Sequence, residues 1–243
     1  RVTNLPEKVP DMHQKWLREI RFRHLLTMSS GFGKALLMGD DRRAGVGYPD
    51  YMAYMMKQPV VKEPGTVFDY STADSILAGR MVEKATGKRL DVYLYEHVFT
   101  KLGQGWPIWE NDPQGHPIGG GGMEMKLTDM LKLGQVYLSG GNWRGEQIVD
   151  PDWVREATKK QIDTVNKNHD VWNMGYGYQF WCNAREGFRG DGSGGQLCFV
   201  LPERKMVFAL QTRLGNMQEE IDGLYELAAH IHDTDDEPVS VIM

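Results

Sequence analysis

The chain has few cysteines, which limits the disulfide bonds and metal sites that could stabilise it. Only two occur among 243 residues, Cys182 and Cys198, too few for a disulfide framework and, by themselves, for a zinc site. Both lie in segments predicted to be strands, so we expect two buried free thiols. No motif implies zinc or a nucleotide, and we expect no metal and no other cofactor.

Long apolar runs and clusters of basic residues are also missing. No apolar stretch approaches the ~20 residues of a membrane-spanning helix, so the sequence predicts no membrane span. The formal net charge is −5, from 28 Lys and Arg against 33 Asp and Glu. This balance argues against nucleic acid as a partner. The apolar content of 41% is ordinary for a globular protein of one large or two small domains.

A phosphate-binding loop is absent too, although the chain contains a run of four glycines from Gly119 to Gly122. No Gly-Lys-Ser/Thr follows this run and no strand precedes it, so it does not read as a nucleotide-binding loop. Glycines have no Cβ and let backbone approach a neighbouring group closely. We expect such a close approach at this loop, beside a cavity.

The most informative stretch is residues 63–74, EPGTVFDYSTAD. A Pro-Gly turn leads into a short extended run, and Ser71 or Thr72 can then serve as the N-cap of a helix. Asp74 follows Ser71 by three residues, as in a capping box. Tyr70 therefore lies just outside a helix N-terminus, where the dipole favours negative charge and can ease ionisation of a phenol. A proton-shuttling tyrosine and a packing tyrosine with a satisfied hydroxyl both fit this pattern.

The apolar periodicity divides the chain into a helical and a strand-rich part. Residues 1–170 are predicted to form a mainly helical subdomain that carries Tyr70. Residues 171–232 are predicted to form an antiparallel sheet with a C-terminal helix, and 233–243 a tail. Strands are expected at four places, namely 175–182, from 188 onward, 197–201 and 206–212. This order of elements predicts the α+β class.

Several motifs resemble those of the serine β-lactamase and penicillin-binding-protein-like hydrolase superfamily, which includes class C β-lactamases, DD-peptidases and esterases. Residues 20–32, IRFRHLLTMSSGF, resemble the signature IRHLLTHTSG of a scaffold helix near the active site. Residues 123–130 and 143–149 resemble two further family strings. The family's Tyr-x-Asn reads Tyr70-Ser71-Thr72 here and departs at its third position. The resemblance covers roughly residues 5–231.

The resemblance implies a β-lactamase/transpeptidase-like fold, with an antiparallel sheet flanked by helices and a helical subdomain. It implies that Tyr70 is catalytic and that Thr72 contacts the substrate. The third family motif, usually Lys/His-x-Gly on a strand, falls at Gly190, Asp191 and Gly192, followed by Ser193. These small residues suit a substrate lying along a strand edge. Asp191 fits either a functional residue or a turn residue, and His24 fits a satisfied, partly buried histidine better than a catalytic one.

The nucleophile motif of the family, Ser-x-x-Lys, is not found in the printed sequence. Ser30 has Lys34 four residues on, with a glycine between them, which is a poor substitute. In the family the motif precedes the HLLTMSSG string by several tens of residues. We therefore expect a processed or truncated chain whose fold is incomplete at the N-terminus. Its compartment, whether cytoplasm, periplasm or outside the cell, is not revealed.

Two functions from different classes follow. The first is a serine hydrolase, an enzyme if the expected N-terminal segment is present, that cleaves a small-molecule ester, amide or β-lactam through an acyl-serine. An esterase or amidase is favoured over a true β-lactamase because residues 190–192 lack the Lys that commonly meets a substrate carboxylate. The alternative is a non-catalytic penicillin-binding-protein-like binding module or an inactive fragment. The sequence predicts no oligomeric state.

Overall fold

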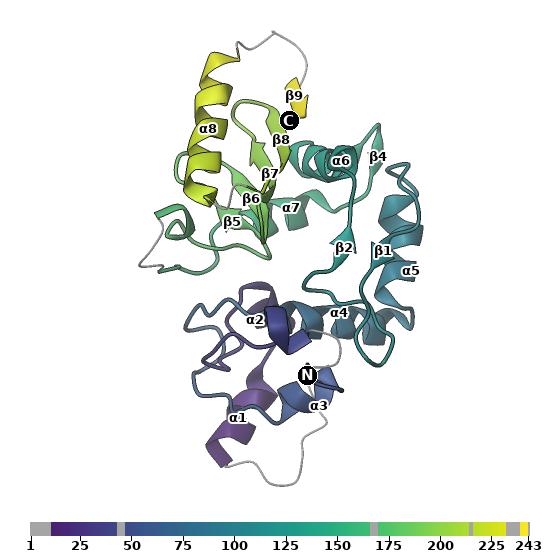
Figure 1. Ribbon diagram of the computed structural model, residues 1–243, viewed down its shortest axis with the longest axis vertical. Coiled ribbons are helices and arrows are strands. Elements are labelled where there is room, and N and C mark those ends of the chain that lie inside the picture. Colours follow the sequence, from purple (N-terminus) through teal and green to yellow (C-terminus); the bar gives the residue numbers. More distant parts are fainter. Residues whose placement is uncertain (1–10, 43–46, 166–169, 214–215, 232–238, 243) are drawn as a thin grey trace. The chain divides into compact units, whose positions relative to one another are not determined.

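The computed structural model describes residues 11–42, 47–165, 170–213, 216–231 and 239–242 (Figure 1). The chain forms two compact units. The first unit is Arg1–Phe99 with Gly105–Glu124, and the second unit is Thr100–Gln104 with Met125–Met243. The predicted boundary at residue 170, between a helical subdomain and a sheet portion, stays a prediction.

The first unit is mainly helical in its described residues. Its described elements are α1 (Asp11–Glu19), α2 (Phe22–Leu26), the 3-10 helix η1 (Gly39–Arg42), α3 (Tyr51–Met56), α4 (Thr72–Thr86), α5 (Leu90–Leu94), the π-helix η2 (Tyr95–Phe99) and the antiparallel pair β1 (Ile108–Trp109) and β2 (Met123–Glu124). The long helix α4 packs against α2, and its first two turns are buried.

Helix α4 begins where the sequence predicted, but without the predicted capping box. Ser71 holds the N-cap position and Gly87 ends the helix with a left-handed φ of 69°. The Ser71 Oγ does not reach the helix N–H groups; it accepts a hydrogen bond from the Leu36 backbone N–H at 3.0 Å. The Asp74 carboxylate binds Ser30. The predicted capping box is therefore wrong, because both side chains bind the loop after α2 instead.

The second unit holds the sheet and the helices that cover it. Its described elements are α6 (Leu127–Leu138), β3 (Asn142–Trp143), β4 (Glu146–Gln147), α7 (Pro151–Thr158), the 3-10 helix η3 (Asp170–Trp172), β5 (Trp181–Cys182), β6 (Phe188–Gly192), β7 (Gln196–Leu201), β8 (Met206–Gln211), α8 (Met217–His230) and β9 (Val239–Ile242). The main sheet has the order β5-β6-β7-β8-β9. Strands β5 to β8 pair antiparallel, as predicted, whereas β9 pairs parallel with β8.

Both faces of this sheet are covered, by α8 on one side and α6 on the other (Figure 1). Along β7, Leu197 and Phe199 pack into the cluster that includes α8, whereas Cys198 and Val200 pack on the α6 side. This alternation follows from the two-residue period of a strand. Because both faces of the sheet are buried, nearly every residue of β7 is apolar.

One local prediction fails in this unit. The segment 175–182 is mostly a tight turn, in which the Gly177 N–H donates to the Phe180 carbonyl at 2.7 Å and Gln179 has a φ of 65°. The turn brings the rings of Tyr176 and Trp181 to 4.8 Å, so the aromatic alternation serves packing rather than a long strand.

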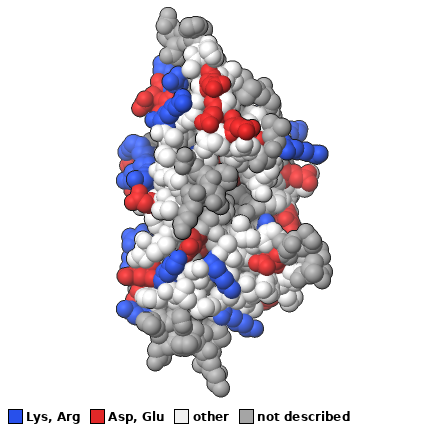
Figure 2. All heavy atoms as spheres, turned by 60° about the vertical axis from the view of Figure 1, so that its left-hand side comes forward, with Lys and Arg blue, Asp and Glu red and all other residues white. Residues whose placement is uncertain are grey.

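In the part of the chain that the structure describes, no helix combines the length and the apolar character that crossing a membrane requires. On the face turned forward in Figure 2, basic and acidic side chains are interspersed among uncharged ones.

Candidate active site

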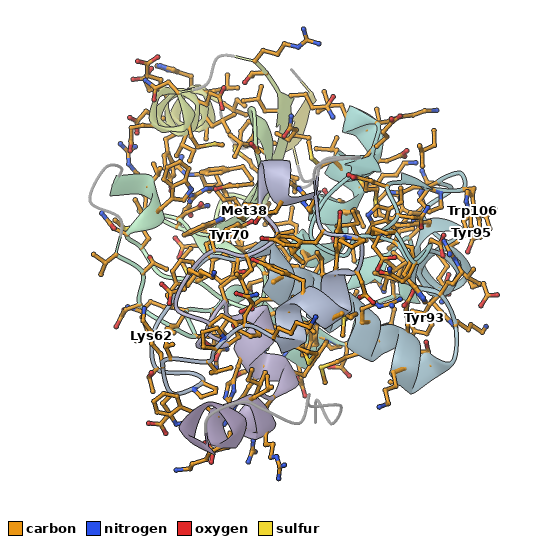
Figure 3. The ribbon with its side chains drawn as sticks, turned by 60° about the horizontal axis from the view of Figure 1, so that its bottom comes forward. Met38, Lys62, Tyr70, Tyr93, Tyr95 and Trp106 are labelled. Carbon is orange, nitrogen blue, oxygen red and sulfur yellow. The ribbon has the colours of Figure 1, made fainter. Side chains whose placement is uncertain are left out.

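Tyr70 lies directly before α4 on a backbone that is held from both sides. The Asp69 N–H donates to the Met28 carbonyl at 2.8 Å, and the Ala73 N–H donates to the Leu36 carbonyl at 3.2 Å. Tyr70, whose side chain is labelled in Figure 3, is 40% exposed. A half-exposed phenol on a fixed backbone is accessible to a substrate, as a proton-transfer role requires.

Thr72, the second residue predicted to contact substrate in this region, is buried in the first turn of α4. Its hydroxyl points to the Met38 thioether, with an Oγ1–Sδ distance of 3.0 Å. A thioether is a weak acceptor. The Thr72 hydroxyl could therefore exchange its contact with Met38 for a hydrogen bond to a stronger acceptor. Its role in substrate binding stays a prediction.

The glycine run packs against the start of α4. A Cβ added at Gly119 would lie 2.7 Å from the Ser75 carbonyl oxygen, and one at Gly120 would lie 2.7 Å from Thr72 Cγ2. The backbone of the glycine run thus closely approaches the helix that follows Tyr70, whereas the sequence had indicated a close approach to a cavity. The glycines are needed here because any side chain would push the loop away from this helix.

Arg42 is a residue that the sequence analysis did not single out. A Cβ at Gly121 would lie 3.4 Å from its Nη1. Its Nε and Nη1 are buried and, among the described residues, have no hydrogen-bond partner. The only signal in the sequence was a basic residue inside the loop between Gly31 and Gly47. A buried guanidinium beside the glycine run can attract a carboxylate or another anion.

Ser30 and Asp74 form a buried pair in the same unit. The Ser30 hydroxyl donates to Asp74 Oδ1 at 2.6 Å. Burial raises the pKa of Asp74 to about 7, against the lowering effect of its hydrogen bonds with Ser30. Because the Ser30 hydroxyl is buried and donates to a carboxyl group, it is not positioned to attack a substrate.

His24 is buried in α2, as a satisfied histidine would be. Its Nδ1 accepts a hydrogen bond from the Arg21 backbone N–H at 3.2 Å. Burial, followed by the positive charges of Arg23 and Arg21, lowers the pKa of His24. The side chain therefore favours the neutral form.

In the second unit, the candidate residue Asp191 is tied to a buried arginine. Arg189 Nε donates to Asp191 Oδ1 at 2.9 Å, and Trp172 Nε1 donates to Oδ2 at 3.0 Å. Burial raises the pKa of Asp191, although the charge of Arg189 and both hydrogen bonds act to lower it. Arg189 is 1% exposed and also donates to the carbonyls of Cys182 and Val171. Both carboxylate oxygens of Asp191 thus have structural partners.

The other residues predicted in this motif lie at the end of β6. Gly190 pairs with Cys198 of β7, Gly192 pairs with Gln196, and Ser193 is exposed in the turn that follows. Strand β5 pairs with β6 only as far as Arg189. Among the described residues, the edge of β6 opposite β7 therefore has no strand partner from Gly190 onward, and a Cβ at Gly190 would meet no atom within 4 Å.

The chain belongs to the Beta-lactamase family, whose model matches residues 3–231. It is 26% identical over 132 residues to the 6-aminohexanoate-dimer hydrolase of Paenarthrobacter ureafaciens. The aligned region covers 52% of this chain and 33% of that protein. The relatives thus support membership of a serine hydrolase family.

Solved structures confirm the predicted β-lactamase/transpeptidase-like fold. The octameric penicillin-binding protein homologue of Pyrococcus abyssi has a TM-score of 0.63 at 21% identity, over 93% of this chain and 60% of that one. A β-lactamase of Mycobacterium bovis has a TM-score of 0.59 at 19% identity, over 85% and 74%. A penicillin-binding protein of Bacillus halodurans has a TM-score of 0.60 at 17% identity, over 88% and 76%. The chain spans about a third of the curated relative and 60% of the Pyrococcus protein.

Proposed function

We propose that this chain is part of a serine hydrolase that cleaves a small ester or amide through an acyl-serine intermediate. The observation that carries the proposal is the match to the Beta-lactamase family over residues 3–231, within which Tyr70 stands half-exposed at the start of α4. The nucleophile, a serine in Ser-x-x-Lys, would lie outside the printed residues.

The chemistry requires two transfers of the acyl group. The serine Oγ attacks the carbonyl carbon while its proton passes to a base, and the leaving alkoxide or amine takes up a proton as the bond to carbon breaks. Water then attacks the acyl-serine, and the serine regains its proton. Tyr70 is the residue of this chain that would relay these protons, because it stands at the position of the family's tyrosine motif and is 40% exposed.

An ester or amide substrate suits the third motif better than a β-lactam. Residues 190–192 contain no lysine to bind a substrate carboxylate, and the single acidic residue, Asp191, pairs with Arg189. The relative named for an amide-bonded dimer points the same way. The substrate would lie along the free edge of β6 at Gly190.

The test uses the full-length protein and a fluorophosphonate serine probe followed by intact mass spectrometry. We expect one probe adduct, and ester hydrolysis that Tyr70→Phe slows by about 10²- to 10⁴-fold in kcat/KM. Tyr48→Phe is the matched control, since Tyr48 is 38% exposed and Tyr70 40%. Its kcat/KM should stay within about twofold, a surface-type effect.

Other outcomes would separate the alternatives. A full-length protein that forms no adduct and hydrolyses neither esters nor amides would reject the hydrolase and leave a non-catalytic binding module or an inactive fragment. That second candidate is favoured by the absence of Ser-x-x-Lys from the printed sequence. Efficient hydrolysis of a chromogenic cephalosporin would instead reject the preference for esters and amides while keeping the acyl-serine mechanism.

A further inference from the structure

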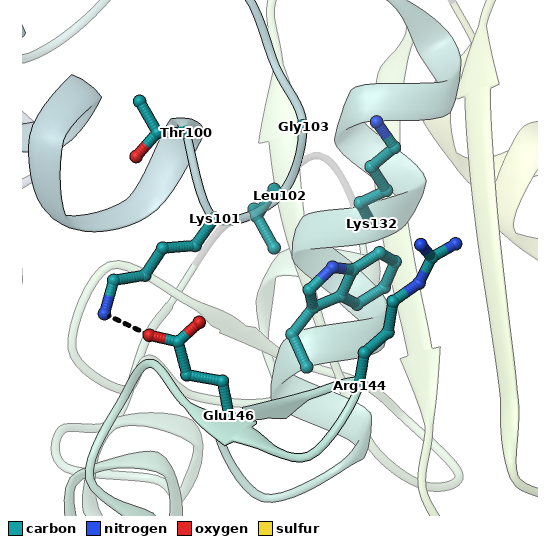
Figure 4. Close-up of a pocket in the computed structure, with 8 residues that line it drawn as sticks. Thr100, Lys101, Leu102, Gly103, Lys132, Arg144 and Glu146 are labelled. Atoms are coloured by element: carbon teal, nitrogen blue, oxygen red, sulfur yellow. Dashed lines mark ion pairs between the residues drawn. The ribbon is translucent and has the colours of Figure 1, made fainter.

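The second unit contains a groove that uses none of the candidate active-site residues (Figure 4). Its volume is about 390 Å³, within the range of small-molecule sites. Three segments line it, namely the stretch before Gln104, helix α6 and the β3–β4 hairpin. The lining residues are Thr100, Lys101, Leu102, Gly103, Lys132, Trp143, Arg144 and Glu146.

The segments that form the groove are fixed by their own hydrogen bonds. The Gln104 side-chain amide donates to the Asp129 carbonyl of α6 at 3.1 Å. In the hairpin, Trp143 pairs with Glu146, and the Gly145 N–H donates to Asn142 Oδ1 at 2.9 Å. These bonds hold the stretch before Gln104 against α6 and fix the fold of the hairpin.

The groove is positively charged in a chain that is negative overall. Lys101, Lys132 and Arg144 line it against a single carboxylate, Glu146, whereas the chain carries a net charge of −5. Lys101 pairs with Glu146 at 2.7 Å, and Lys132 pairs with Asp129 at 3.0 Å. These pairs leave one cation for a ligand.

That cation is Arg144. Among the described residues it has no carboxylate within ion-pair distance, and its guanidinium lies 5.4 Å from the ring centre of Trp143. Trp143 and Leu102 supply the large apolar side chains of the lining, and Figure 4 shows Leu102, Lys132 and Arg144 around the same groove. The groove thus combines an apolar floor with a guanidinium, the group that binds carboxylate or phosphate with two hydrogen bonds.

We propose that this groove binds a small molecule that carries an oxyanion, a carboxylate or a phosphate, on an aromatic or aliphatic body. Arg144 binds the oxyanion, and Trp143 with Leu102 contacts the apolar body. The site is independent of Tyr70 and does not rest on the proposed hydrolase activity.

The experiment uses 19F NMR of 4-fluorobenzoate with the full-length protein and its Arg144→Gln variant. We expect saturable binding that Arg144→Gln weakens about tenfold, as the loss of one charge-assisted pair would. The neutral 4-fluorobenzamide should bind about tenfold more weakly than the benzoate for the same reason. Arg155→Gln is the matched control, because Arg155 is an exposed arginine on α7 outside the groove.

Two further measurements make each outcome decisive. Inorganic phosphate that displaces the benzoate supports an oxyanion site that accepts either source, whereas phosphate that fails to displace it supports a carboxylate ligand. Arg144 is exposed, so its variant should fold, and circular dichroism checks this. No saturable binding, equal binding of the benzamide, or equal affinities of the Arg144→Gln and Arg155→Gln variants would overturn the proposal.

Discussion

Ser30 and Asp74 lie 44 residues apart in the chain and meet in the interior of the first unit. The Ser30 hydroxyl donates to Asp74 Oδ1 at 2.6 Å, and the Ser30 backbone N–H lies 3.3 Å from Oδ2. Asp74 is 0% exposed. The pair ties the loop after α2 to the first turn of α4, and so fixes the helix start that carries Tyr70.

This pair should make stability fall as the pH rises. Burial raises the pKa of Asp74 from 3.8 to about 7, so between these values the folded chain keeps a proton that the unfolded chain releases. The unfolded state then binds fewer protons, and the free energy of unfolding falls by up to about 1.4 kcal/mol per pH unit. Asp74→Asn has no such proton.

Urea unfolding of both proteins at several values between about pH 4 and pH 7 checks this prediction, because contributions from other groups cancel in the difference. The variant should gain stability relative to the parent chain as the pH rises. A constant difference would show that Asp74 titrates normally.

The glycine run should be intolerant of a side chain where it meets α4. Gly120→Ala places a Cβ 2.7 Å from Thr72 Cγ2 and 2.9 Å from its carbonyl oxygen. We expect a loss of about 1–3 kcal/mol of unfolding free energy from overpacking, and lower activity of the full-length protein as the helix start shifts. Gly105→Ala is the control, since its Cβ would meet nothing within 4 Å. Equal thermal stabilities of the two variants would contradict the contact.

The Arg189–Asp191 pair should matter for folding. Arg189→Met leaves the Asp191 carboxylate buried without its cation, which costs about 3–5 kcal/mol of unfolding free energy. Arg204→Met, at a half-exposed ion pair with Glu186, should cost about 1 kcal/mol or less. Denaturant unfolding compares the two, and similar losses would mean that the buried pair contributes little.

Asp191→Asn separates a structural from a substrate role for this residue. The amide keeps one acceptor for Arg189 Nε or Trp172 Nε1, so we expect a loss of about 1–3 kcal/mol. If Asp191 has only a structural role, kcat/KM of the folded variant should stay within about threefold of the parent value. This corresponds to a change of less than about 1 kcal/mol in transition-state stabilisation. A much larger drop, with folding verified at the assay temperature, would place Asp191 in contact with substrate.

Two helix glycines of the second unit should respond oppositely to alanine. At Gly134 in α6 a Cβ would lie 2.5 Å from Val207 Cγ1 and 2.7 Å from Cys198 Sγ, so Gly134→Ala should destabilise by about 1–3 kcal/mol. At Gly223 in α8 a Cβ would meet nothing within 4 Å, so Gly223→Ala should stabilise by up to about 1 kcal/mol. Thermal melts should show a lower melting temperature for Gly134→Ala and a higher one for Gly223→Ala. A rise in melting temperature for both variants would argue against the packing of α6 on the sheet.

The sequence by itself determined what depends on neighbours along the chain. Asp150 and Asn216 cap α7 and α8, because an N-cap side chain bonds backbone two or three residues away. The nearly continuous apolar runs of β7 and β8 marked the central strands, since a strand buried on two faces needs apolar residues at successive positions. The family motifs also indicated the fold.

The tertiary structure decided every feature that joins distant segments. Ser71 and Asp74 carry the local signature of a capping box, yet partners from residues 30–36 bind them instead. The close packing of the glycine run against Ser75 and Thr72 of α4 appears only in the folded structure. Periodicity along one segment cannot reveal such pairs, because a hydrogen bond or close contact between remote residues leaves no regular spacing in the sequence.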